Sequence, residues 1–468
     1  MAKQTLAVIF GNRDFFPDQL VSEARRDLEK VFTSLDIEMI ALSGQETKLG
    51  AVETWQHAAL CGDLFRANRS RIDGILVCLP NFGDEKGVAD CIRLSELNVP
   101  VLVQACSDDL DQFGLERRRD AFCGKISVCN NLRQYGTKFS LTRDHTTHIS
   151  SPRFREYLSA FLAVCRTVKG LRRVRIGAVG ARPNAFNTTR YSEKLLEASG
   201  ISVNTIDLSE VFGTAATIAN DDSRVKERIE QICSYADSSS APQESLLKMA
   251  KFSIVVDDWM LSLGLSATAI QCWSSMQKNY GVNVCTIMSM MSEQMLPSAC
   301  EVDIAGVVSM YALQLASGRP AGLVDWNNNY GDDPDKCVFF HCGNWAKDFL
   351  PDIRIGTAPI LGTVLGEANT VGALAGRTPA GPVTFGRVST DDLTGTIRAY
   401  VGQGDFTDDP LDTFGTKAVV KVPHLPELMQ HICRNGFEHH AAMTGAHCAV
   451  PLQEALGNYL GWDVYRHQ

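Results

Sequence analysis

The stretch "RVRIGAVGA", residues 173 to 181, decides how we divide this chain. It is an apolar run followed by a glycine, a pattern typical of a buried strand that leads into a turn. It also follows a helical segment, "CRTVKGLR". It therefore restarts a strand–helix series that is already present upstream. Strands that alternate with helices predict βαβ units and a parallel sheet. We therefore expect a second α/β domain to begin at residue 170.

Upstream of this stretch the same alternation runs through the first third of the chain. The runs "TLAVIF", "IEMIAL", "IDGILVCLP" and "VPVLVQA" read as buried strands, and segments with helical spacing separate them. This pattern predicts an N-terminal α/β domain over residues 1–169. In the second domain, residues 170–318, we expect "GISVNTIDL" and "KFSIVVDD" to be further strands.

The residue pattern of the sequence changes near residue 355. Residues 378–405, "TPAGPVTFGRVSTDDLTGTIRAYVGQGD", contain short β-type runs broken by Gly, Pro and Asp, which predict an antiparallel sheet or barrel. We therefore expect a β-rich C-terminal domain over residues 319–468. The predicted fold class is α/β: two consecutive α/β domains with parallel sheets, followed by this β-rich domain.

Composition and charge narrow the classes of function. The net charge of −9 over 468 residues argues against nucleic acid or an anionic membrane surface as the main partner. The 15 cysteines are scattered singly, with no CxxC pair, which indicates reduced thiols rather than a disulfide framework. The first apolar run is too short for a signal peptide or a membrane span. We expect a cytoplasmic protein with a small-molecule substrate.

Two common catalytic motifs do not fit. The segment "IGAVGARPNAF" has glycines in a G-x-x-G spacing rather than G-x-G-x-x-G, and Pro183 interrupts the expected helix start, which argues against nicotinamide binding. There is no G-x-S-x-G, and the cysteines lie in apolar surroundings that disfavour thiolates.

The ionisable residues of the last third are more informative. Glu301 and Asp325 are carboxylates in apolar surroundings, and His341 follows an apolar strand in "VFFHCGNW". The segment "GFEHHAAMTGAH" adds His439, His440 and His447. Carboxylates plus an imidazole suit Mn²⁺ or Mg²⁺ better than structural zinc, which prefers thiolates. A simpler interpretation stays open: Asp303 is a helix-start charge, and His439 and His447 are ordinary polar residues.

Three segments resemble the superfamily of L-fucose isomerase and L-arabinose isomerase, which are metal-dependent aldose–ketose isomerases. "ACEVDIAG" is similar to the segment with the first metal-binding glutamate, here Glu301, and "GLVDWNN" to the strand with the second carboxylate, Asp325. "EHHAAMTGAHCAV" resembles the histidine segment of the fucose branch, with His440 at the ligand position. The resemblance extends to the whole chain as architecture, with the β-rich domain completing the metal site.

The resemblance implies a mechanism. A divalent cation, Mn²⁺ or else Mg²⁺ or Co²⁺, would be held by Glu301, Asp325 and His440. Glu301 and Asp325 would also be the catalytic pair that moves a proton between C1 and C2 of the sugar through an enediolate. The chain is shorter than the fucose enzymes and has His439 where they have asparagine. The sugar therefore stays open between an L-fucose or D-arabinose type and an anionic sugar such as sulfoquinovose.

The resemblance also implies residues that line the substrate. These are Arg13, Gln271, Trp273, His341, His439 and His447, and we expect Trp326 and Asn327 to join them because they flank Asp325. Arg13 matches an arginine that reaches into a neighbouring subunit's site, which implies a homo-oligomer, a trimer or hexamer, with shared sites. Arg182, Arg190 or the run "ERRRD" could hold an anionic substituent.

Two functions of other classes compete with the isomerase. One is a non-catalytic sugar-binding protein built on a pair of α/β domains. The other is a metal-dependent hydrolase or aldolase that uses the same ligands.

Overall fold

A parallel sheet forms the centre of the N-terminal third. The computed structural model describes residues 3–468. The strands of this first sheet lie in the order β2 (Ile37–Ile40), β1 (Gln4–Gly11), β4 (Gly74–Leu79), β5 (Val101–Ala105) and β6 (Ser140–Leu141), with β3 (Ala51–Val52) also paired to β1. All of these pairings are parallel.

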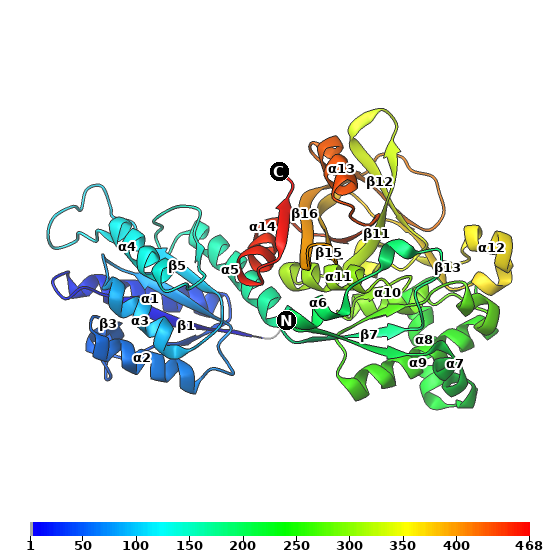
Figure 1. The fold of residues 1–468 in the computed structure, drawn as a ribbon, viewed down its shortest axis with the longest axis horizontal. Helices are drawn as coiled ribbons and strands as arrows, with labels where there is room; N and C mark the ends of the chain where they lie inside the picture. Colours follow the sequence, from blue (N-terminus) through cyan, green and yellow to red (C-terminus); the bar gives the residue numbers. More distant parts are fainter. Residues whose placement is uncertain (1–2) are drawn as a thin grey trace. The chain divides into compact units, whose positions relative to one another are not determined.

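Helices cover both faces of this sheet (Figure 1). Leu6, Val8 and Phe10 pack with α1 (Asp18–Ser34) and α5 (Pro152–Leu171). Ala7 and Ile9 point to the opposite face and pack with α2 (Trp55–Ala67), α3 (Glu85–Ser95) and α4 (Ala121–Gln134). Neighbouring side chains of a strand point to opposite faces, so a sheet covered twice requires the continuous apolar runs seen in the sequence.

The stretch "RVRIGAVGA" forms β7 (Val174–Val179) in a second parallel sheet. The strand order there is β10 (Ser298–Ala299), β9 (Ala267–Ile270), β7 and β8 (Ile201–Ile206). The helices of this part are α6 (Glu193–Ala198), α7 (Leu208–Thr217), α8 (Ser223–Tyr235), α9 (Gln243–Leu263) and α10 (Cys285–Glu293).

One expected strand of this region is wrong. The segment "KFSIVVDD" lies inside α9, where Phe252, Ile254 and Val256 are all buried. A short apolar run fits a buried helix as well as a buried strand, because neither has a polar face to set its periodicity. The strand that follows Ile206 in the chain is instead β9, which is only four residues long.

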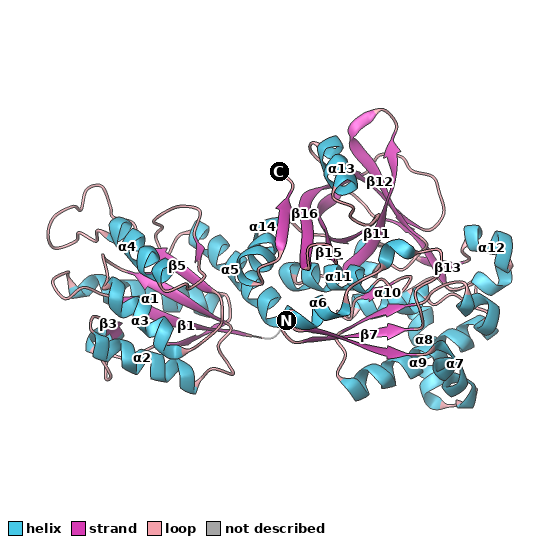
Figure 2. Cartoon of the chain, viewed as in Figure 1, coloured by secondary structure: helices cyan, strands magenta, loops and turns pink. Residues whose placement is uncertain are grey.

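The β-rich part is a mixed sheet that closes on itself. Its strands lie in the order β13 (Arg354–Gly356), β14 (Ala373–Arg377), β17 (Thr416–Lys421), β12 (Asp333–His341), β11 (Ala321–Tyr330), β18 (His440–Thr444), β15 (Gly381–Asp391), β16 (Thr396–Thr407) and β19 (Asp463–Arg466). The stretch from β17 to β16 is antiparallel throughout, and a further pairing of β17 with β16 closes it into a ring. Figure 2 shows these strands in magenta, with α12 (Pro359–Leu365), α13 (Leu425–Arg434) and α14 (Ala449–Gln453) around them.

Helix α11 (Ile304–Ser317) joins the second sheet to the ring. Asp303 caps its first turn by accepting a hydrogen bond from the Gly306 amide, and Gly318 ends it in the left-handed region. The helix is buried along almost its whole length and contacts β9 and β10 on one side and β11, β15 and β18 on the other. The helix therefore lies where the two sheets meet, and Asp303 occupies the helix-start position that the sequence led us to expect.

The predicted fold class is confirmed: two parallel α/β sheets precede a β-rich sheet. By its internal contacts the chain forms two compact units, Met1–Lys169 with Glu454–Gly461, and Gly170–Gln453 with Trp462–Gln468. The second sheet and the ring thus belong to one unit, and the division at residues 318 and 319 stays a prediction. No helix within residues 3–468 is long and apolar enough to cross a membrane.

Candidate active site

Glu301 is presented by the turn between β10 and α11. Both Glu301 and Val302 have a φ near +55°, in the left-handed region that side chains with a Cβ adopt at a cost. Such a backbone persists only where the surroundings determine it, and it is concentrated at functional sites. The turn leaves the Glu301 carboxylate almost fully buried, with 4% of the residue exposed.

Three neighbouring strands of the ring supply the other ionisable groups. Asp325 on β11 is the register partner of His440 on β18, so the antiparallel pairing places the two residues opposite one another. His341 ends β12, and the residue before it, Phe340, is paired with Asp325. Residues that are far apart in the sequence therefore meet because β12, β11 and β18 are adjacent.

The side-chain atoms of these residues converge on His440. Its Nε2 lies 3.5 Å from Glu301 Oε2 and 3.5 Å from Asp325 Oδ1, and His341 Nε2 lies 3.8 Å from the same Glu301 oxygen. These separations are too long for good hydrogen bonds. Within residues 3–468, Glu301 Oε2 and Asp325 Oδ1 are buried and have no hydrogen-bond partner. Buried carboxylate oxygens without a partner are costly, so the site is incomplete as a purely protein structure.

The other nitrogen of His440 is occupied. Its Nδ1 lies 2.8 Å from Asp303 Oδ2, and Asp303 also accepts two hydrogen bonds from Arg387, at 2.5 and 2.9 Å. Arg387 Nε lies 3.1 Å from Glu438, which accepts a further hydrogen bond from Ser389. Because an ionised Asp303 can only accept, Nδ1 of His440 carries a proton, and Nε2 is the nitrogen that faces the two carboxylates.

Asp303, Arg387 and Glu438 form a buried ion cluster behind His440. Burial by itself would raise the pKa of the Asp303 carboxyl, but the Arg387 guanidinium and His440 outweigh it and hold that pKa below its usual range. Asp303 is therefore ionised and orients the imidazole. From the sequence we expected Asp303 only as a helix-start charge, and no sequence pattern marked Arg387, which lies 84 residues further along the chain.

Glu301 has a different environment from Asp303. Burial raises the pKa of the Glu301 carboxyl, and this effect exceeds the opposing effects of His341 and His440. Its Oε1 accepts a hydrogen bond of 2.8 Å from Trp273 Nε1, and the Cys272 thiol lies 3.5 Å from the same oxygen. One oxygen is therefore held in place while the other faces His440 and His341.

Several of the predicted substrate residues lie beside this group. Trp273 contacts Glu301 directly, and His439 Nε2 lies 3.6 Å from Asp325 with its side chain 44% exposed. Gln271 follows β9 and accepts a hydrogen bond from the Ala181 amide. Sequence reasoning missed Phe186, whose ring packs at 5.0 to 6.0 Å from the rings of Trp273, His439 and His440. Its only signal was its place after β7, in the segment "GARPNAF".

Other predicted substrate residues make contacts elsewhere. Trp326 donates to the Tyr400 hydroxyl and packs edge-on against Phe339 and Phe385, and Asn327 is exposed at an irregularity of β11. His447 Nε2 lies 3.0 Å from the Gly404 carbonyl on β16.

Arg13 belongs to the first compact unit. It is hydrogen-bonded to the Gly83 carbonyl, paired with Glu85, and stacked over the Phe82 ring at 4.2 Å. Its predicted contribution to a neighbouring subunit stays a prediction, as does the trimer or hexamer.

The residues present fit a metal ion. Glu301, His341 and His440 form one group whose ligand atoms all lie within 4.8 Å of one another, and Asp325, His439 and His440 form a second. Both groups share His440, whose second nitrogen is hydrogen-bonded to a carboxylate, as is usual for metal-binding histidines. Carboxylate oxygens and imidazole nitrogens suit a divalent cation of the harder kind. The fold and the site together describe an α/β protein with a β-rich C-terminal part and a candidate metal site of carboxylates and histidines.

Comparison with known proteins agrees with this class. Residues 7–172 match the model of the fucose/sulfoquinovose isomerase N-terminal domain, and residues 339–468 match that of the L-fucose isomerase C-terminal domain. The chain belongs to the fucose isomerase-like family and is an aldose–ketose isomerase. The resemblance found in the sequence is confirmed.

Similar curated proteins are sulfoquinovose isomerases. That of Alkalicoccus urumqiensis is 26% identical, over 76% of this chain and 78% of its own length. Those of Priestia aryabhattai and Priestia megaterium are each 25% identical, over 86% of this chain and 88% of their own length. Glu301 and Asp325 lie between the two segments that match family models, so their roles rest on the geometry described above.

Proposed function

We propose that this enzyme interconverts an anionic aldose of the sulfoquinovose type with its ketose, with Glu301 and Asp325 as the proton-transfer pair. One observation carries the assignment of these residues. The buried, unpartnered oxygens Glu301 Oε2 and Asp325 Oδ1 each lie 3.5 Å from the same nitrogen of His440. Two carboxylates that face one imidazole are suited to hold a cation and to move a proton.

The protein groups have distinct tasks in this proposal. Glu301, held by Trp273, accepts the proton from C2 of the sugar, and Asp325 assists its return at C1. Asp303 fixes the tautomer and orientation of His440, while Trp273 and Phe186 form an aromatic wall that excludes water. Glu301, Asp325 and His440 would hold the cation, with His341 and His439 beside them. When bound, Mn²⁺ or a similar divalent cation supplies a Lewis acid that stabilises the negative charge of the enediolate.

One observation supports an anionic sugar over a neutral one. The similar curated proteins are sulfoquinovose isomerases, and sulfoquinovose is a hexose that carries a sulfonate. A cavity of about 670 Å³ is lined by Arg190, Arg398 and Arg434, but also by Asp391, Asp392 and Glu438. Arg398 is already paired with Asp391, so the charges of this cavity do not by themselves favour an anion.

A panel of sugars tests the substrate. We expect sulfoquinovose to be converted to its ketose in the presence of Mn²⁺, with solvent deuterium appearing in the product in D₂O. We expect L-fucose and D-arabinose to react more slowly, since they lack the anionic group. A chelator should stop the reaction, and added Mn²⁺ should restore it. Turnover of the neutral sugars alone would contradict the anionic assignment, and fragments or binding without turnover would contradict isomerisation.

The substitution Asp303→Asn tests the positioning of His440. Asparagine still caps α11, but it no longer holds the imidazole with a charged acceptor. Loss of such a partner of a metal-binding histidine costs about 10- to 100-fold in metal affinity, and we expect this loss for Mn²⁺. Equilibrium dialysis of Mn²⁺ measures it. The matched control is Asp207→Asn, since Asp207 caps α7 by the same kind of hydrogen bond. Equal Mn²⁺ affinity in both variants would show that Asp303 only caps α11 and pairs with Arg387, without supporting metal binding by His440.

A further inference from the structure

Four cysteines from four separate segments surround the back of the candidate active site. Cys272 follows β9, Cys285 begins α10, Cys300 follows β10 and Cys342 follows β12. The first three are buried, with at most 2% exposed, and Cys342 is partly buried. The proposed isomerisation uses none of these thiols, and three of them, Cys285, Cys300 and Cys342, form a group of possible metal ligands without any active-site residue.

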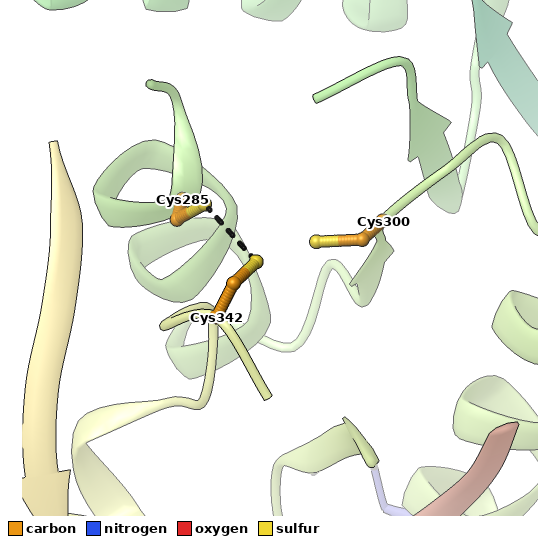
Figure 3. Close-up of side chains that lie close together, drawn as sticks. All are labelled: Cys285, Cys300 and Cys342. Atoms are coloured by element: carbon orange, nitrogen blue, oxygen red, sulfur yellow. Dashed lines mark hydrogen bonds between the residues drawn. The ribbon is translucent and has the colours of Figure 1, made fainter. Parts of the chain in front are cut away.

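The sulfur atoms are close enough to share one ion. Cys285 Sγ and Cys342 Sγ are 3.9 Å apart, and the ligand atoms of Cys285, Cys300 and Cys342 all lie within 4.8 Å of one another. Figure 3 shows the three thiols pointing toward a common centre. In a tetrahedral zinc–thiolate site, Zn–S bonds of about 2.3 Å place the sulfurs about 3.8 Å apart. The sulfurs of Cys285, Cys300 and Cys342, which lie within 4.8 Å of one another, would therefore have to move closer together by at most about 1 Å to reach that spacing.

Cys272 provides a fourth sulfur at the side of Glu301. Its Sγ lies 3.5 Å from Glu301 Oε1, and Cys272, Cys300 and Glu301 form a group within 4.8 Å. Cys300 belongs to both groups. Neither Cys272 nor Glu301 lies within 4.8 Å of all three of the other thiols, so either must move toward them to complete a tetrahedral set. The four sulfurs are a soft donor set, in contrast to the oxygens and nitrogens on the other side of Glu301.

We propose that Cys272, Cys285, Cys300 and Cys342 form a second metal site, selective for thiophilic d¹⁰ cations such as Zn²⁺ or Cd²⁺. Each thiol that becomes a ligand releases its proton to the solvent as a metal–sulfur bond forms, and nothing is oxidised or reduced. The site differs from the Glu301–Asp325–His440 group in donor chemistry, although Cys272 and Cys300 lie beside Glu301.

Occupation of this site would reach the proposed active site directly. Cys300 precedes Glu301, and Cys342 follows His341, with its Sγ 3.4 Å from His341 Nδ1. Movement of these two sulfurs toward a bound cation would therefore also shift Glu301 and His341. This consequence rests on the proposed function: Cd²⁺ or Zn²⁺ should inhibit isomerisation even when Mn²⁺ is in excess.

Titration of the reduced, metal-free protein with Cd²⁺ tests the site. Cadmium–thiolate bonds give an ultraviolet charge-transfer band that oxygen and nitrogen ligands do not, so the band reports this site and not the other. We expect the band to saturate at one Cd²⁺ per chain. In Cys285→Ala the band should lose on the order of a quarter of its intensity, as one of four ligands is removed. The control Cys337→Ala, at a buried cysteine of β12 that belongs to neither group, should keep the full band.

Two further experiments distinguish failure of the thiol site from failure of the proposed isomerase function. Glu301→Gln should keep most of the band while losing isomerisation, so loss of activity with a retained band leaves the thiol site intact. X-ray absorption of Cd²⁺ on the unmodified protein counts its sulfur neighbours, which covers the case in which Cys285→Ala does not fold. We expect three or four sulfurs. An environment of oxygen and nitrogen alone, or a band that Cys285→Ala leaves unchanged, would overturn the proposal.

Discussion

Glu301→Gln is expected to lower kcat by roughly 10²- to 10⁴-fold, the usual contribution of a positioned proton acceptor. The amide keeps the size of the side chain and can still meet Trp273, but it cannot take the proton from C2 or supply an anionic ligand. The fold should remain intact. Because burial raises the pKa of the wild-type carboxyl, the ionised form is unfavourable in the metal-free protein, and an uncharged amide removes that cost.

The measurement is deuterium exchange at C2 of the sugar, followed by NMR, together with thermal unfolding in the absence of metal. Glu210→Gln, at an exposed position on α7, is the matched control and should behave as the wild type. Activity that survives in Glu301→Gln with added Mn²⁺ would show that another group accepts the proton. A large loss of metal-free stability would show that the carboxylate is structural.

Arg387→Met is expected to reduce the free energy of unfolding by about 3–5 kcal/mol, as removal of one partner from a buried ion pair does. Arg387 is fully buried and contacts both Asp303 and Glu438. Methionine fills much of the same volume, but it leaves two buried carboxylates without their cation. The loss should therefore come from uncompensated charge rather than from a cavity.

The pH dependence of this loss follows from Asp303. In the wild type the pKa of Asp303 is held below its usual range, so its contribution to stability is present above the unfolded-state pKa of about 3.9 and is lost as the pH falls through the lowered value. In Arg387→Met the strongest opposing charge is gone, and burial disfavours the ionised carboxyl. The difference in unfolding free energy between the two proteins should thus be largest near neutral pH and should narrow as the medium becomes acidic.

Chemical denaturation at several pH values measures this difference. Arg224→Met is the control, because Arg224 forms an exposed pair with Asp258 and exposed pairs contribute little. A loss in Arg387→Met as small as that of the control would mean that water or another group compensates the two carboxylates. A difference that grows at low pH would contradict the ionised state of Asp303.

The fold followed from sequence patterns wherever an element was long and regular. The runs that became β1, β4, β5 and β7 are continuous and apolar, which is what a strand covered on both faces needs. The pattern failed for the centre of α9, where burial on several sides removed the polar face that marks a helix. It also could not show that β17 pairs with β16, because closure of a ring depends on strand register.

Some residues of the candidate site could be named from the sequence, and others could be recognised only in the structure. Glu301 and Asp325 could be named from the sequence because a carboxylate in an apolar run is expensive and demands a partner, and His440 was named through the resemblance of its segment to the family's histidine segment. Arg387 could not, since it becomes the counter-charge of Asp303 only when β15 lies beside α11. The same holds for the four thiols, which are scattered singly along the chain and meet only at the ends of four different elements.

What the sequence by itself determined, then, was the order of elements, the class of sheets and the residues whose burial requires a reason. Local spacing and the cost of burying charge are properties of a short stretch of chain, so they can be read along it. Only the tertiary structure decided which groups share one environment: that His440 has one nitrogen on Asp303 and the other on two carboxylates, and that Arg387 stands behind them. Those facts depend on long-range strand pairing and helix packing, for which no short segment carries a signal.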